Sequence, residues 1–117
     1  MATIAKQRLS AETTSGESSV LIAATATAGT AIHAAVSGTS DIDEVWLWAN
    51  NNHTAAVVLE IEWGNTTANR NIQVTIQPNE TVLVVPGWIA NDSNAIAAFA
   101  SVTNVINVHG YVNRISA

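Results

Sequence analysis

One part of the chain, residues 42–63, carries the clearest pattern of hydrophobic and polar positions. In residues 57–63 the odd-numbered positions are all apolar, while Glu60 and Glu62 occupy even-numbered ones. This period of two is typical of a β-strand with one face on the core, so both glutamates are expected in solvent. Residues 42–50 are also rich in β-branched and aromatic side chains, and a polar turn cluster separates the two runs. The pattern predicts a β-hairpin.

The first strand of this pair is apolar on both of its faces. Val45, Leu47 and Ala49 share one face, and Trp46 and Trp48 share the other. A strand that is apolar on both faces needs cover on both sides. One side is expected to form the domain core, and the other requires a second layer or another subunit.

Further apolar runs, bounded by polar turns, predict about eight antiparallel strands at a spacing of roughly 8–12 residues. Such a series indicates an all-β fold of the β-sandwich or jelly-roll type. Alanine favours helix, but the length and flanking turns of residues 95–102 favour a strand. Gly110 is expected at a bulge or a close backbone approach. The remaining predicted strands are residues 20–28, 31–36, 70–76, 81–85 and 104–115, with residues 86–89 leaving the sheet.

The first nineteen residues differ from the rest because they are polar and carry few apolar anchors, among them Ile4 and Leu9. They can be interpreted as a frayed terminus or as an extended arm that becomes ordered on a partner. The residues alone favour fraying. Fully extended, such an arm would reach roughly 60–65 Å, enough to cross a neighbouring subunit. We therefore divide the chain into a segment 1–19 and a β-sandwich domain 20–117.

The low fraction of charged residues and the negative net charge limit which kinds of partner the chain can bind. Only 11% of the residues are charged, against about 25% in typical soluble domains, so partners are expected to cover part of the surface. The net charge is −5 with four basic residues, which argues against direct binding of nucleic acid. There is no cysteine. No apolar run reaches the roughly 18 residues of a membrane span, and the N-terminus lacks a signal-peptide pattern, so we expect no membrane span and synthesis in the cytoplasm of the producing cell.

The three histidines, His33, His53 and His109, are the first candidates for metal ligands. No two of them stand at ligand spacing, and no carboxylate or cysteine cluster accompanies them. We interpret them as one turn and two strand residues, and expect no metal or other cofactor. A trimer axis could still gather three copies of one histidine, for which His109 is the best candidate.

The acidic group Asp41, Asp43 and Glu44 is the second candidate for chemistry. General acid–base catalysis needs two carboxylates with separated pKa values in a pocket. These three open a strand beside a turn, where carboxylates are ordinarily solvated. The sequence also lacks a nucleophile elbow and a phosphate-binding glycine loop. We therefore expect no enzymatic activity.

The pair Trp46 and Trp48 admits two interpretations. Tryptophans can stack on sugar rings, as in carbohydrate-binding modules. They are equally expected in a core or at a subunit interface. The need for cover on both faces of this strand favours a core or an interface.

Three segments, residues 42–48, 60–64 and 104–115, together resemble small structural proteins of tailed bacteriophages, of the capsid decoration or cement type. The resemblance implies an all-β domain, usually a homotrimer, on the outer capsid lattice, where it braces neighbouring major capsid proteins. In such proteins an N-terminal arm often contacts the capsid, so the resemblance favours the arm interpretation of residues 1–19. It brings no catalytic residues.

We therefore expect a non-enzymatic virion protein that bridges major capsid protein subunits on the outer capsid, after synthesis in the host cytoplasm. Alternatives are a tail, fibre or head-to-tail joining component, or a carbohydrate-binding module that uses the tryptophan pair. The expected interface residues are Ile4, Lys6, Arg8, Leu9, Trp46 and Trp48.

Overall fold

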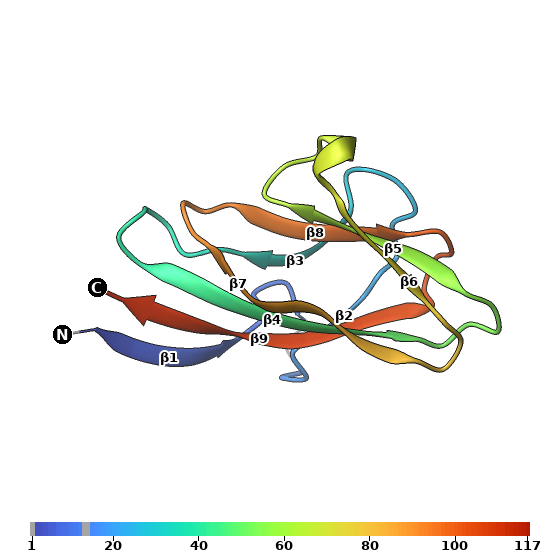
Figure 1. Cartoon of the computed structure of the whole chain (residues 1–117). Coiled ribbons are helices and arrows are strands. Elements are labelled where there is room, and N and C mark those ends of the chain that lie inside the picture. The colour runs from blue at the N-terminus through green and yellow to red at the C-terminus, as the bar shows by residue number, and fades with distance from the viewer. Residues whose placement is uncertain (1, 13–14) are drawn as a thin grey trace.

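The computed structural model describes residues 2–12 and 15–117 and is a β-sandwich of two antiparallel sheets (Figure 1). This confirms the predicted all-β sandwich. The described part of the chain contains no helix that is long and apolar enough to span a membrane. One sheet contains β1 (Thr3–Arg8), β2 (Ser19–Leu21), β4 (Ile42–Asn51), β7 (Thr81–Ala90) and β9 (Ile106–Ser116). The other contains β3 (Thr30–Ala34), β5 (Val57–Trp63), β6 (Ile72–Ile76) and β8 (Ala95–Ala100), and a short 3-10 turn spans Ala68–Arg70.

Strand order places β4 and β9 at the centre of the larger sheet. The order is β1-β9-β4-β7, and β2 also pairs with β9. Because β1 pairs with residues 111–116 and β2 with residues 107–109, the two short strands follow each other along one edge of β9. The smaller sheet has the order β3-β8-β5-β6. Figure 1 shows both termini at one end of the sandwich, where β1 and β9 lie side by side.

The predicted hairpin over residues 42–63 is wrong, because β4 and β5 belong to different sheets. β4 lies between β7 and β9, and β5 lies between β6 and β8. The connection between them crosses from one sheet to the other. Buried Asn51 holds this crossing, since its Nδ2 donates to the carbonyls of Ala55 and Ile76. Alternation specifies which face of a strand is buried, but it does not specify the neighbouring strand.

The core lies between the two sheets and follows the predicted alternation. In β4 the residues Val45, Leu47 and Ala49 have no exposed surface. In β5 the odd-numbered residues from 57 to 61 are likewise buried. Within the described residues every buried hydrophobic side chain is Leu, Ile, Val or Ala. The core is therefore aliphatic, and the aromatic side chains stand at its margins or outside it.

One of the two glutamates expected in solvent is buried. Glu62 is 2% exposed, and Thr27 Oγ1 and the Gly29 N–H, at 2.7 Å, both donate to its carboxylate. The segment predicted as a strand over 20–28 leaves the sheet after Leu21, and its later part covers Glu62. Hydrogen bonds from the chain thus replace water around the carboxylate. Alternation within a strand cannot predict such a covering segment.

The edge strand β7 continues through residues that were expected to leave the sheet. Pro86 cannot donate to a ladder, but β7 pairs only with β4, and proline is tolerated at such an edge. The register shifts between Val45 and Trp46 and again between Leu47 and Trp48, which marks bulges. Gly87 has φ +75 at this point, in the region that favours glycine.

The N-terminal segment has a place in the sheet that neither interpretation anticipated. β1 pairs with β9 from Thr3 opposite Ser116 to Arg8 opposite Tyr111, and all six of its residues are exposed. Leu9, which follows, is 1% exposed and belongs to the core. Part of the segment 1–19, namely residues 1, 13 and 14, lies outside the described residues. Its role as an arm on a partner stays a prediction.

Candidate interaction surface

The outer face of the larger sheet gathers the candidate residues. Core-facing positions of β4 are odd-numbered, so its even-numbered residues point outward, and their partners in neighbouring strands share that face. Register adds Ile115 opposite Ile4, and Leu83 opposite Trp48. We call this surface the aromatic face, and it comprises Ile4, Lys6, Arg8, Leu21, Glu44, Trp46, Trp48, Leu83, Ile89, Tyr111, Asn113 and Ile115.

Three aromatic rings form its centre. The ring centroids of Trp46 and Trp48 are 6.4 Å apart with an interplanar angle of 21°. Those of Trp48 and Tyr111 are 6.0 Å apart at 29°. The Lys6 ammonium lies 4.3 Å from the centroid of the Tyr111 ring, which is cation–π distance. The three rings are half-buried and hold one another in place, so little side-chain freedom remains to be lost on binding.

A hydrogen-bonded carboxylate fixes the indole of Trp46. Its Nε1 donates to Glu44 Oε1 at 2.8 Å, and Asn113 Nδ2 donates to the same oxygen at 3.1 Å. The bond from Trp46, helped by the bond from Asn113, lowers the pKa of Glu44 against the opposing effect of burial. The strand residue expected to be a freely solvated acid is therefore part of the aromatic face.

Two glycines make room for Trp46. A side chain at Gly110 would begin 2.0 Å from the Trp46 carbonyl oxygen, so β9 approaches β4 closely, as expected at this position. A side chain at Gly87 would begin 2.7 Å from Trp46 Cζ2. The indole therefore lies directly over the bulge of β7.

The aromatic face also collects exposed aliphatic side chains. Ile4 is 70% exposed, Ile89 is 59% exposed, and Leu21 and Leu83 are about half exposed. These are four of the six large hydrophobic side chains that the described chain leaves exposed. Scattered single apolar residues are ordinary on a surface, whereas a contiguous group on one face indicates an interaction site.

Register places five of the six predicted interface residues on this side of the sheet, and the sixth elsewhere. Ile4, Lys6 and Arg8 alternate along β1 and reach the same face as Trp46 and Trp48. The Arg8 guanidinium turns back to Glu12, at 3.2 Å. Leu9 is the exception, since its burial in the core withholds it from any partner in this conformation.

Asp43 contradicts the expectation that the acids opening β4 are solvated. It has no exposed surface, and it accepts bonds from Arg114 Nε at 2.7 Å and Nη2 at 2.9 Å. His33 Nε2 lies 2.8 Å away, and the Val36 N–H donates at 3.0 Å. Burial acts most strongly on the pKa of Asp43 and raises it, but the bonds from Arg114 and His33 together outweigh it, so the pKa is lowered. The hydrogen bonds to Asp43 raise the pKa of Arg114 in turn.

The histidine in this network has no nitrogen left for catalysis. The Ser10 N–H donates to His33 Nδ1 at 3.1 Å, so the ring proton must lie on Nε2, which donates to Asp43. The Ser10 hydroxyl accepts from the Ala34 N–H at 2.7 Å instead of approaching the ring. The arrangement therefore differs from a Ser–His–Asp triad and ties the β1–β2 connection to β3 and β4.

The other two histidines stand apart. His109 is exposed and lies opposite Trp48 on the outer side of the sheet, and His53 follows β4 in the crossing to β5. Among the described residues no three His, Asp or Glu side chains gather as a metal site. A histidine cluster on a trimer axis stays a prediction.

Two of the grooves on the described surface lie beside charged or aromatic side chains. One, of about 790 Å³, is lined by Lys6, Arg8 and Arg114 together with Glu12 and His33. Three of the four basic residues of this acidic chain are thus concentrated around β1. The second, of about 370 Å³, lies beside Trp63 and Arg70.

Sequence patterns missed Tyr111, Glu44 and Asn113 as members of the aromatic face. Their alternation within each strand was readable, but their meeting depends on the pairing of β9 with both β1 and β4. Comparison of the chain with protein-family models, with curated proteins and with solved structures finds no match in any of the three.

Proposed function

We propose that this chain is a non-enzymatic structural protein that works through its aromatic face. In its most specific form, the proposal is a tailed-bacteriophage decoration protein that sits on the outer capsid as a homotrimer and bridges major capsid protein subunits. The observation that carries the proposal is the rigid stack of Trp46, Trp48 and Tyr111 on the outside of a sheet.

The physical support lies in the kind of surface that this stack presents. Tryptophan and tyrosine dominate binding energy at interfaces, because each removes a large apolar area from water at small entropic cost. Here the indole N–H of Trp46 already donates to Glu44. A partner that covers the face would therefore leave no unpaired hydrogen-bond donor at that ring. Copies of the chain are the proposed cover for the part of the face around Trp48.

The proposed capsid contact is β1. Ile4 is largely exposed, and Lys6 gives this edge a positive charge in a chain of net charge −5, while the charge of Arg8 is paired with Glu12. A surface of the opposite charge on a capsid protein would fit it. A trimer would present three such strands at once, so contacts that are weak singly would together give strong retention.

Binding to capsids tests the contact through β1. We expect the double variant Ile4→Asp, Lys6→Glu to keep its fold and oligomeric mass but to lose sedimentation with purified phage capsids. Both side chains are exposed, and Leu9, which anchors the segment in the core, is retained. Wild-type binding by this variant, compared with Phe99→Ala on the other sheet as control, would remove β1 from the proposal.

Copy number per virion separates the capsid role from a tail, fibre or joining role. A decoration protein should be present in proportion to the major capsid protein, as quantitative mass spectrometry of purified virions would show. A number fixed by a single tail would favour the alternative, and complete absence from virions would overturn the phage assignment.

A further inference from the structure

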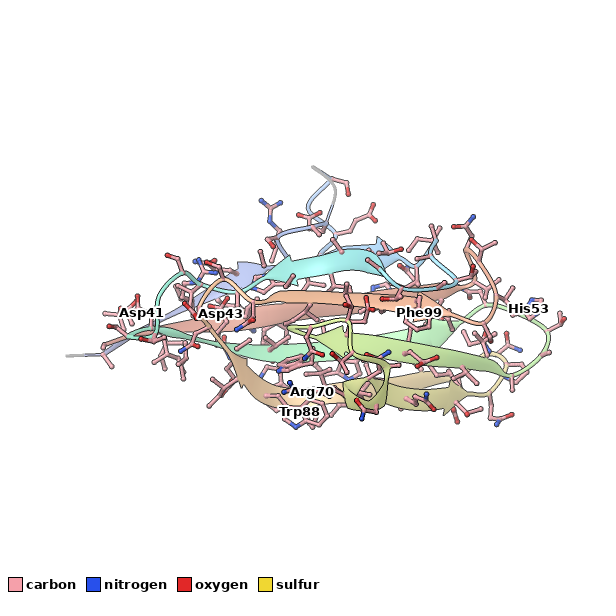
Figure 2. All side chains as sticks on the ribbon, turned by 90° about the horizontal axis from the view of Figure 1, so that it is seen from above. Asp41, Asp43, His53, Arg70, Trp88 and Phe99 are labelled. Carbon is pink, nitrogen blue, oxygen red and sulfur yellow. The ribbon has the colours of Figure 1, made fainter. Side chains whose placement is uncertain are left out.

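The groove beside Trp63 has the properties of a small-ligand site and lies away from the centre of the aromatic face. Its volume, about 370 Å³, falls within the range of ligand pockets, roughly 300–1,000 Å³. It is formed by the end of β5, the loop after it, the end of β7 and the turn before β8. Figure 2 labels Arg70 and Trp88 on this side of the molecule. We call it the Trp63 groove.

One wall of the groove is apolar and held rigidly. The rings of Trp63 and Trp88 meet edge to face, with centroids 5.8 Å apart and an interplanar angle of 87°. The buried residues Ala90 and Ile96 continue this wall. An indole whose orientation is fixed by a second indole offers a flat surface for the apolar face of a ring.

The opposite side supplies hydrogen-bond acceptors. Asn91 Nδ2 donates to the Asp41 carbonyl at 3.3 Å, and Asn94 Nδ2 donates to the Asn91 carbonyl at 2.9 Å. These bonds orient both amides, and neither Oδ1 has a hydrogen-bond partner among the described residues. Gly64 keeps the space open, since a side chain there would begin 3.2 Å from Asn94 Oδ1.

Arg70 supplies the charge. Its side chain is exposed, and within the described part of the chain its guanidinium makes no hydrogen bond or ion pair. It is the one charged residue in the lining of the groove. A free guanidinium beside oriented acceptors and an indole favours a ligand that carries a carboxylate, several hydroxyls and an apolar ring face.

We propose that the Trp63 groove binds one pyranose unit of an acidic glycan, with its carboxylate on Arg70. Hydroxyl groups of the sugar donate to Asn91 Oδ1 and Asn94 Oδ1, and the C–H face of its ring packs on Trp63. This site is distinct from the Trp46 and Trp48 pair, and it holds independently of the capsid role proposed above.

Matched pairs of sugars test the proposal in solution. The ¹⁵N-labelled full chain would be titrated with the methyl glycosides of glucuronic, galacturonic and N-acetylneuraminic acid. The neutral partners are methyl glucoside, methyl galactoside and the carboxyl methyl ester of the N-acetylneuraminic acid glycoside. We expect at least one acid to give saturable shifts at Gly64, Arg70 and Asn94, with an affinity roughly tenfold above its neutral partner. The amide signals of Trp46 and Trp48 should stay in place.

Two variants test whether the sugar binds in the Trp63 groove. Arg70→Gln should lower the affinity for the acid roughly tenfold and leave the affinity for the neutral sugar unchanged, because it removes only the charge. Phe99→Ala, on the outer side of the smaller sheet, should bind like the wild type. Absence of saturable shifts with all three acids, equal affinity for acid and neutral sugars, or shifts confined to the aromatic face would each overturn the proposal.

Discussion

The residue that most changes the picture of this chain is Asp43. Asp43 was expected to be solvated at the start of β4. It is instead fully buried, and its carboxylate bonds to both Arg114 and His33. A buried charge pair contributes little net stability compared with an apolar pair, but breaking it leaves an uncompensated charge. The network therefore acts as a constraint that fixes β3, β4 and β9 relative to one another.

Replacing Arg114, the positively charged partner of Asp43, should show how strongly this network constrains the fold. We expect Arg114→Met to lower the free energy of unfolding by about 3–5 kcal/mol, because it leaves the buried Asp43 carboxylate without its cation. Urea denaturation followed by circular dichroism would measure the loss. Arg70→Gln serves as control, since an exposed residue without such a partner should change stability by less than about 0.5 kcal/mol. A similar small change for Arg114→Met would show that the pair is not held in solution.

The lowered pKa of Asp43 also predicts a pH dependence. In the unfolded chain this carboxyl returns to its ordinary value of 3.8 and binds protons more readily than in the fold. Its contribution is complete above that value and is lost as the pH falls through the lower folded pKa. We expect the free energy of unfolding to decline below about pH 4, and Asp43→Asn to show a shallower decline. Parallel pH profiles for the two proteins would contradict this assignment.

At the scale of elements, strand faces could be predicted from the sequence and strand partners could not. The alternation in residues 42–50 and 57–63 assigned the buried apolar positions correctly, because side-chain period is a local property, but it missed the burial of Asp43 and Glu62. Pairing is not local, so a turn-like cluster between two strands suggested a hairpin where the chain changes sheet. For the same reason, the sequence indicated Trp46 and Trp48 as members of the aromatic face, whereas the place of Tyr111 follows only from the strand register.

The close approach of β9 to β4 gives the sharpest expectation at this scale. We expect Gly110→Ala to destabilise the fold by about 3 kcal/mol or more, since the new methyl would begin 2.0 Å from a backbone oxygen of Trp46. Gly38→Ala is the control, because nothing lies within 4 Å of its side-chain position and only its φ of +74 carries a cost, roughly 1–2 kcal/mol. Thermal unfolding of both variants would rank them, and an equal loss would refute the close approach.

At the scale of the whole molecule, this chain has an aliphatic core inside and much of its aromatic surface outside. Low charge and a stacked aromatic face are the observations that support the proposed assembly. Composition suggested this character, and the resemblance supplied the phage context. The Trp63 groove was not anticipated, because its walls come from segments that only the fold brings together.

Mass by light scattering across a range of protein concentrations tests the central claim most directly. We expect the wild-type chain to show about three times its 12.2 kDa, and Trp48→Lys to fall to a single chain while keeping its circular dichroism spectrum. Phe99→Ala should keep the wild-type mass. A wild-type chain that stays at 12.2 kDa at every concentration, with Trp46 and Trp48 open to a soluble quencher, would contradict the account.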